Sequence, residues 1–339
     1  MTTSKKRGRQ TAALTHPPVC VGWASVAGKK EREGPLADTF TKTCADDAFG
    51  QNSWEKAESE MQRLALTSAL DKAGVAPSQL DFVLAGDLLN QCIGTGFAMR
   101  DVAAPFYGLY GACSTMAESL SLASLLLDGG FGTLAAALTS SHFCSAERQY
   151  RTPLEYGGQR SPTAQWTVTG SGAVVLTTEG TGPCVTHVTT GRIVDKGIKD
   201  PSNMGAAMAP AAYDTIRAHL TDTGRKPSDY DLIVTGDLGK LGHEIVWDFF
   251  HRDGMDLNNL VDCGMLIYDL EGQDVHCGGS GCGCSAAVLG GYLLDGLKAG
   301  RWNNILFCGT GALLSPTSTM QGESIPSICH AVALASGNG

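Results

Sequence analysis

The chain has 339 residues, 43% of them apolar and 17% charged, which is enough for one large or two medium hydrophobic cores. Its formal net charge of −9 excludes a broad nucleic-acid-binding face, because binding phosphates requires concentrated positive charge. The longest apolar stretch, residues 119–127, is far shorter than the roughly 18 residues needed to span a bilayer, so we expect no transmembrane helix. Twelve cysteines without framework spacing, and no signal peptide, favour a reducing, cytoplasmic compartment.

The first ten residues, MTTSKKRGRQ, are basic and lack an apolar face. We expect residues 1–16 to form a solvated tail, and the alternative is attraction to an anionic lipid surface. The rest of the chain divides into two parts, which we place at residues 17–181 and 182–339.

An internal repeat supports this division. Residues 74–88 match residues 224–238 at an offset of 150 positions, and each copy contains a helix-capping glycine, a proline turn and an apolar strand ending in Gly-Asp. The sequence LLDG at 126–129 recurs at 293–296. A period near 150 is too long for a solenoid and predicts a duplicated domain.

Within each half, helices alternate with short apolar strands, which predicts a layered α/β fold. Ligands of such folds gather where strands end and helices begin. This points to the four loops at residues 85–91, 107–115, 140–143 and 274–285.

Cys113 comes directly before an apolar helix predicted at residues 116–127. The partial positive charge of a helix N-terminus lowers a thiol pKa and favours a nucleophile or an anion contact. The alternative is a buried structural cysteine.

The second-half loop HCGGSGCGCS, residues 276–285, occupies the equivalent place. Its glycines, with Gly279 and Gly281 at the centre, let backbone N–H groups converge on an anion or a developing oxyanion. A metal site made of His276 and the three cysteines is disfavoured, because the spacing lacks a second ligand pair.

Further candidates follow neighbouring strands. Ser141 and His142 end the strand predicted at 134–139, although the histidine could equally lie on the surface. Arg160 could clamp a carboxylate or be exposed. Asp87 and Asp237 end the two repeat strands, and each could serve a ligand or cap a turn.

These motifs resemble the thiolase-like superfamily, which carries its nucleophilic cysteine in a context similar to GACST at residues 111–115. GDLLNQ (86–91), FYGLYGACST (106–115), EYGGQ (155–159), PTAQWTVTG (162–170), HCGGSGCGCSA (276–286) and GTGALLSP (309–316) resemble a sporulation-protein family within it. The resemblance covers the chain from about Cys20 to Val332. It implies a five-layered α/β/α/β/α fold made of two duplicated βαβαβαββ halves.

The resemblance also implies a function, namely non-enzymatic binding of dipicolinic acid (pyridine-2,6-dicarboxylate), free or as its calcium chelate, for uptake into the developing spore. Implied partners are other proteins of the same sporulation operon, the spore inner membrane as a peripheral contact, and a second copy joined at the sheet edge of the first half. No other cofactor is expected.

Catalysis by Cys113 is the alternative, as in thiolase-like or ketoacyl-synthase-like acyltransferases. Condensing enzymes need histidine or asparagine partners for the cysteine. Here Asp237 stands at one such position, His243 lies beyond it, and His276 lacks the thiolase Gly-His-Pro context. Cys308 resembles the second thiolase cysteine only loosely. A third possibility is a scaffold with an unused site.

The ligand's carboxylates are expected to meet the helix start at Cys113 and the N–H groups of Gly279 and Gly281. Donors from Ser141, His142, Arg160 and His276 would complete the site. Asp87 would act through water or through the calcium ion of the chelate.

Overall fold

The computed structural model describes residues 4–150 and 160–337. Its strands form one continuous path made of two groups of five. The first-half group, in sheet order, is β3 (Val19–Ala27), β9 (Gly170–Thr177), β7 (Leu134–Ser141), β5 (Phe82–Gly86) and β6 (Phe106–Gly108). The second-half group is β10 (Cys184–Thr189), β15 (Ser327–Ala335), β14 (Asn304–Ala312), β11 (Leu232–Thr235) and β12 (Leu260–Asp262).

The two groups have the same pattern of strand directions. In each group the last three strands run parallel, and the others pair antiparallel. The groups meet between β3 and β10, where a single residue pair, Val19 and Cys184, is in register. This arrangement confirms the duplication that the sequence repeat predicts.

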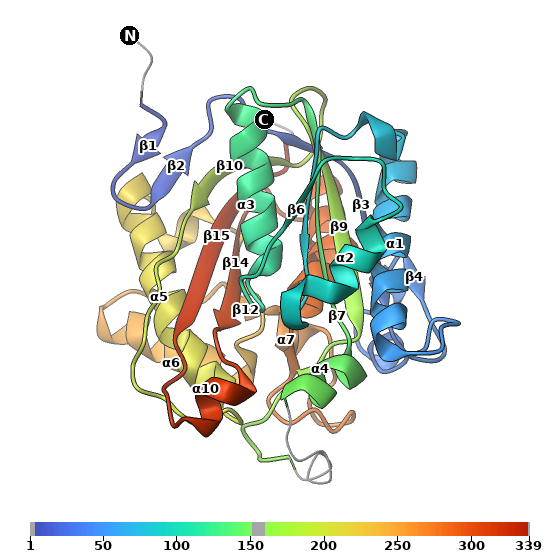
Figure 1. The fold of residues 1–339 in the computed structure, drawn as a ribbon. Coiled ribbons are helices and arrows are strands. Elements are labelled where there is room, and N and C mark those ends of the chain that lie inside the picture. The colour runs from blue at the N-terminus through green and yellow to red at the C-terminus, as the bar shows by residue number, and fades with distance from the viewer. Residues whose placement is uncertain (1–3, 151–159, 338–339) are drawn as a thin grey trace.

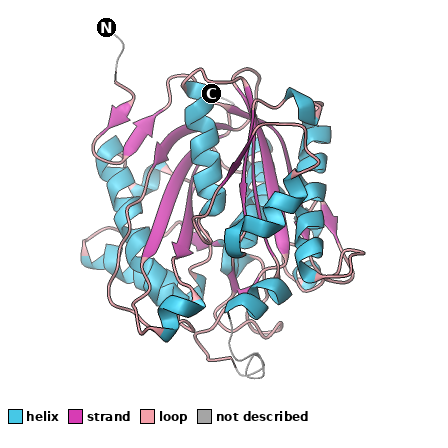
Figure 2. Cartoon of the chain, viewed as in Figure 1, coloured by secondary structure: helices cyan, strands magenta, loops and turns pink. Residues whose placement is uncertain are grey.

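Helices form three layers around the two strand groups (Figures 1 and 2). The central layer contains α3 (Thr115–Asp128) and the run α8 (Cys282–Val288), a π-helical turn (Leu289–Leu293) and α9 (Leu294–Lys298). Helices α1 (Trp54–Ala73) and α2 (Ile93–Met99) cover the first group from outside, and α5 (Met204–Thr223) and α6 (Gly239–Arg252) cover the second. The predicted five layers are therefore present.

The remaining elements are short. They are the helices α4 (Phe143–Tyr150), α7 (Cys263–Leu266) and α10 (Pro316–Met320), the strand β4 (Lys42–Thr43), and the two-stranded parallel ladder of β8 (Trp166–Thr167) and β13 (Gly279–Ser280).

The repeated segments fold alike for local reasons. Helices α1 and α5 both end at a glycine in the left-handed region, Gly74 at φ 69° and Gly224 at φ 68°, where a side chain would be strained. A proline then begins a single 3₁₀ turn in each copy, at Pro77 and Pro227. Each turn leads into the first strand of its parallel set, so both copies deliver an aspartate to the same end of a sheet.

The central helices approach the strands at backbone distance. A Cβ atom added to Gly172 of β9 would lie 2.0 Å from the carbonyl oxygen of Ala286 in α8. One added to Gly309 of β14 would lie 2.7 Å from the Cβ of Ala117 in α3. These glycines let each central helix lie against a sheet, which fixes the positions of the helix starts.

The N-terminal segment differs from the predicted solvated tail. Residues Lys6–Arg7 (β1) and Thr11–Ala13 (β2) form a hairpin, and β2 pairs with β10. The carboxylate of Asp222 accepts hydrogen bonds from the backbone N–H groups of Arg9, Gln10 and Thr11, at 2.8–3.0 Å. The partner lies more than two hundred residues away, so no local pattern could indicate it.

Candidate functional site

Cys113 lies one residue before Ser114, the N-cap position of α3. The turn is held by two hydroxyl groups, because Ser114 donates to the carbonyl of Gly111 and Thr115 donates to that of Ala112, both at 2.7 Å. Ala112 has a positive φ of 49°, an uncommon conformation for a residue with a side chain. The resulting tight turn buries the cysteine, which is 6% exposed.

The neighbour of the Cys113 thiol is Asp237, a fully buried carboxylate within hydrogen-bonding reach of the sulfur. Asp237 accepts hydrogen bonds from the hydroxyl of Thr310 (2.7 Å), the backbone N–H of Gly281 (2.9 Å) and the hydroxyl of Ser280 (3.3 Å). The structure thus brings the cysteine turn of the first half and the glycine loop of the second half to one place.

Both acidic groups have raised pKa values. Burial raises the pKa of Asp237 to about 7. Burial, followed by the charge of Asp237, raises the pKa of the Cys113 thiol well above its usual value. The sequence predicted the opposite direction from the helix start. Desolvation and a neighbouring carboxylate together outweigh a partial helix charge, so Cys113 is a thiol that can donate to Asp237.

Apolar and aromatic side chains surround the thiol. Leu88, Ala146 and Cys282 pack around Cys113, and Tyr150 packs against this cluster. The hydroxyl of Tyr150 donates to the carbonyl of Leu88 at 2.6 Å and shares a 2.8 Å hydrogen bond with Tyr110. The two tyrosines were missed in the sequence, although Tyr110 lies only three residues before Cys113.

N–H groups of the glycine loop donate hydrogen bonds to other residues of the protein. Gly281, with φ 99°, precedes α8 and donates to Asp237. Gly283 donates to the hydroxyl of Ser141 at 3.1 Å, and the carbonyl of Gly279 accepts from the amide of Gln165 at 2.8 Å. Two of the N–H groups that were predicted to face an anion, those of Gly281 and Gly283, therefore already bind separate protein oxygens.

Ser141 and His142 are fully buried behind this loop. The hydroxyl of Ser141 donates to the carbonyl of Val168 at 2.7 Å. His142 donates from Nε2 to the carbonyl of Asp47 (2.7 Å), and its Nδ1 accepts from the N–H of Cys144 (3.1 Å). Burial lowers the pKa of His142, so a neutral ring with both nitrogens engaged forms part of the wall.

Asp87 caps its own loop. Its carboxylate accepts from the N–H of Leu89 (2.7 Å) and from the N–H (2.6 Å) and hydroxyl (2.5 Å) of Thr95. Burial, and then the charge of Asp87, raises the pKa of neighbouring Glu58 to about 8. Across residues 4–150 and 160–337, no three His, Cys, Asp or Glu side chains are grouped to hold a metal ion.

Arg160 and His276 belong to a separate group. The Nδ1 of His276 donates to the carbonyl of Ser161 (2.5 Å), and its Nε2 lies 3.2 Å from the carboxylate of Asp274. Arg160 donates to the carbonyl of Asp274 at 2.5 Å, and its side chain is only 6% exposed. Within the described residues neither side chain is hydrogen-bonded to Cys113. The EYGGQ motif at 155–159 lies outside the described residues.

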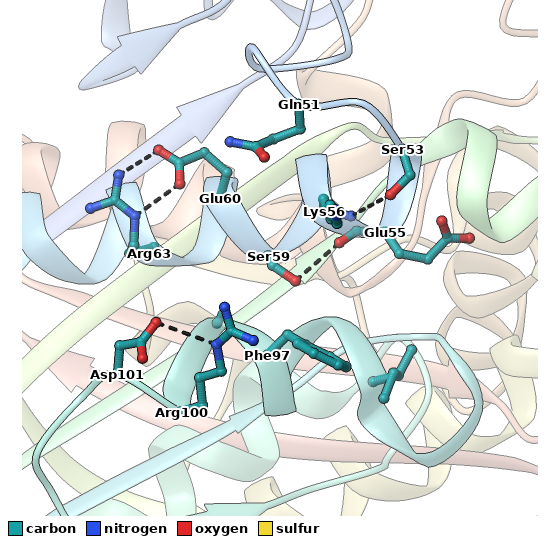
Figure 3. A pocket seen from close by; sticks show the side chains of 12 residues that line it. Gln51, Ser53, Glu55, Lys56, Ser59, Glu60, Arg63, Phe97, Arg100 and Asp101 are labelled. Carbon is teal, nitrogen blue, oxygen red and sulfur yellow. Dashed lines mark hydrogen bonds and ion pairs between the residues drawn. The ribbon is translucent and has the colours of Figure 1, made fainter.

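A groove of about 610 Å³ lies between α1 and α2 (Figure 3). Arg63 pairs with Glu60 and Arg100 pairs with Asp101, so these opposite charges neutralise one another. None of the predicted site residues lines this groove, which therefore does not serve the Cys113 site.

Comparison with known proteins identifies the family. The family model of stage V sporulation protein AD (SpoVAD) matches residues 8–335. The chain belongs to the SpoVAD family. Stage V sporulation protein AD of Bacillus subtilis (strain 168) is 46% identical over 329 residues, covering 97% of each chain. The chain is thus similar over nearly its whole length to a known member of the SpoVAD family.

The chain also shares its fold with condensing enzymes. The 3-oxoacyl-[acyl-carrier-protein] synthase III of Aquifex aeolicus VF5 has a TM-score of 0.56 at 14% identity, covering 94% of this chain and 99% of that one. OleA of Xanthomonas campestris with bound cerulenin has a TM-score of 0.61 at 13% identity, covering 95% and 99%. At such identities the similarity establishes the fold and leaves the chemistry to the site residues.

The raised pKa of Asp237 predicts a pH dependence of stability. An acid whose pKa is raised by folding stabilises the protein at low pH, and this contribution is lost as pH rises through the folded value, here about 7. Glu31 and Glu58, with pKa values raised to about 7 and about 8, act in the same direction. We expect the melting temperature to fall between pH 6 and pH 8, and to fall less steeply in Asp237→Asn.

Asp222→Asn is the matched control for this experiment. Hydrogen bonds from the N-terminal hairpin help to hold the pKa of Asp222 below its usual value, so this group does not titrate between pH 6 and pH 8. Its removal should lower the melting temperature equally at both values. An unchanged slope in Asp237→Asn would contradict the assignment.

Proposed function

We propose that this chain binds dipicolinic acid, free or as its calcium chelate, without covalent chemistry, and that it does so at the Cys113 site for uptake into the developing spore. Membership of the SpoVAD family, which is a sporulation family, supports the biological setting. The observation that carries the chemical part is the contact between the Cys113 thiol and the buried Asp237 carboxylate.

This contact favours binding over acyl transfer. A cysteine nucleophile attacks as the thiolate, which requires a lowered pKa or an adjacent base. Burial, and then the charge of Asp237, instead raises the thiol pKa. His243 donates from Nε2 to the carbonyl of Leu260 at 3.2 Å, and His276 contacts Ser161 and Asp274. The histidines that could activate the thiol are therefore engaged elsewhere.

The same residues could hold a dicarboxylate. The Cys113 thiol and the hydroxyl of Tyr110 lie near the start of α3, whose partial positive charge attracts an anion, and both would turn from their present acceptors to donate to the ligand. Near pH 7 Asp237 is partly protonated, and an incoming dianion would favour its protonated form. Binding is then coupled to proton uptake. Asp87, Ser141, His142, Gly279 and Gly281 would shape the wall behind the ligand.

The proposal predicts pH-dependent binding of pyridine-2,6-dicarboxylate. By isothermal titration, affinity should rise as pH falls from 8 to 6, because protonation of Asp237 removes a negative charge beside the ligand. Cys113→Ala should weaken binding by about tenfold, since a hydrogen bond to a charged group is lost. Asp237→Asn should make the affinity nearly independent of pH over this range.

Cys44→Ala is the control, because Cys44 is partly exposed and lies outside the cluster around Cys113. Acyl mass on Cys113 after incubation with acetyl-CoA would favour the acyltransferase alternative. If neither dipicolinate, its calcium chelate nor acetyl-CoA raises the melting temperature, the site is an unused remnant.

We further propose that two copies pair through the first half. Strand β6 lies at the edge of the sheet, and its Phe106 and Tyr107 are 42% and 51% exposed. Ile93 and Phe97 of the adjacent α2 are exposed as well. An unpaired edge with large apolar side chains is suited to strand addition by a second copy. Light scattering should give twice the chain mass of 35.4 kDa, and Phe97→Asp with Tyr107→Lys should halve it.

Peripheral contact with the spore inner membrane and with other proteins of the operon is part of the proposal. No helix in residues 4–150 and 160–337 has the length and apolarity needed to cross a membrane. The exposed hairpin residues Lys6, Arg7 and Arg9 could approach an anionic lipid surface. Sedimentation with anionic vesicles should fall in a variant that replaces all three by Gln, and unchanged sedimentation would count against this contact.

A further inference from the structure

Two positively charged side chains lie over the indole ring of Trp166, at the start of β8. Phe143 stacks on the indole at 3.9 Å between ring centroids, with planes 9° apart. The ammonium of Lys30 lies 4.2 Å from the ring centroid, and the guanidinium carbon of Arg160 lies 4.7 Å from it. Burial, and then the nearby charge of Arg160, lowers the pKa of Lys30. Two cations are thus held within reach of one another.

Arg160 has an unused donor. Its side chain is 6% exposed, and Nη2 contacts the carbonyl (2.5 Å) and carboxylate (3.2 Å) of Asp274. Nη1 is buried and has no hydrogen-bond partner within the described residues. A buried guanidinium nitrogen without an acceptor costs free energy, so native structures normally supply one. The arrangement leaves this donor available to an acceptor other than the described residues.

Three acids, Asp274, Glu31 and Glu33, lie near the two cations. Asp274 is 81% exposed and divides its carboxylate between Arg160 and His276. Glu31 is buried and bonded to the hydroxyl of Tyr268, and burial raises its pKa to about 7. Two cations held over one indole, of which the Arg160 side chain is only 6% exposed, are suited to holding an anion.

We propose that Lys30 and Arg160 form an anion-binding site beside Trp166 whose occupant is a carboxylate. Two donors are available, the Lys30 ammonium and Nη1 of Arg160, which matches the two oxygens of a carboxylate better than the three of a phosphate. The stacked rings of Phe143 and Trp166 provide an apolar side for the body of an aromatic acid.

The site is connected to Cys113 by the ladder of β8 and β13. Trp166 is in register with Gly279, and Thr167 with Ser280. Gly281, the residue that follows β13, donates to Asp237 beside the thiol. The carboxylate site therefore lies at the outer end of the same two strands. If the occupant is dipicolinate, this inference rests on the proposed function. Dipicolinate would then contact the outer site before it reaches Cys113.

The test uses benzoate as a simple aromatic carboxylate and follows tryptophan fluorescence. Benzoate should change the emission of Trp166, and this change should be absent in Trp166→Phe. Arg160→Gln and Lys30→Gln should each raise the half-saturating benzoate concentration by about tenfold, because each removes a charged donor. Inorganic phosphate should compete more weakly than pyridine-2,6-dicarboxylate.

Two cations over other indoles provide matched controls. Lys298 lies over Trp23 and Arg301 lies over Trp302. Lys298→Gln and Arg301→Gln should leave the benzoate titration unchanged. The inference is overturned if Lys30→Gln behaves like these controls, if the signal persists in Trp166→Phe, or if phosphate competes equally well. If Arg160→Gln does not fold because it loses the contacts to Asp274, the Lys30→Gln variant still tests the inference.

The same variants separate this inference from the proposed function. If Cys113→Ala weakens dipicolinate binding while benzoate titrates normally, both stand. If Lys30→Gln and Arg160→Gln do not affect the benzoate titration, the outer site fails and the Cys113 site remains. If dipicolinate binding depends on Arg160 but not on Cys113 or Asp237, the outer site stands and the proposed function at Cys113 fails.

Discussion

The buried carboxylate of Asp237 is the constraint on which the site depends. It ties together three elements, because its hydrogen-bond partners come from β14, from the glycine before α8 and from the cysteine turn before α3. A buried carboxylate without such partners would be strongly destabilising. The same contacts keep Cys113 in its protonated form. One carboxylate therefore couples the packing of the two halves to the chemical state of the thiol.

The two halves of the repeat show how neighbours determine the role of a residue. Asp87 and Asp237 occupy equivalent positions, but the carboxylate oxygens of Asp87 accept hydrogen bonds from Leu89 and Thr95 of its own loop. In the second half Asp262 performs that capping, accepting from the N–H groups of Leu238 and Gly239 at 2.8 and 3.0 Å. Asp237 is thereby free to turn toward Cys113.

The shared fold with condensing enzymes and the altered site are physically compatible. Layer packing depends on apolar helix faces and on glycines such as Gly172, which can be kept while the polar residues at the strand ends change. Burial and the neighbouring acid Asp237 raise the pKa of the Cys113 thiol, which can then donate a hydrogen bond. In the proposed binding role, the pair Lys30 and Arg160 at the end of the adjoining ladder would attract the anion.

The sequence by itself determined the local features. The capping glycines Gly74 and Gly224, the strands that follow them and the helix after Cys113 were predictable, because turns, caps and apolar periodicity act over a few residues. Only the tertiary structure decided that Asp237 meets Cys113, that His142 turns toward Asp47, and that Asp222 holds the N-terminal hairpin. Those contacts join residues far apart in the chain. The direction of the thiol pKa was also decided there, because burial depends on the whole fold and outweighs the local effect of a helix start.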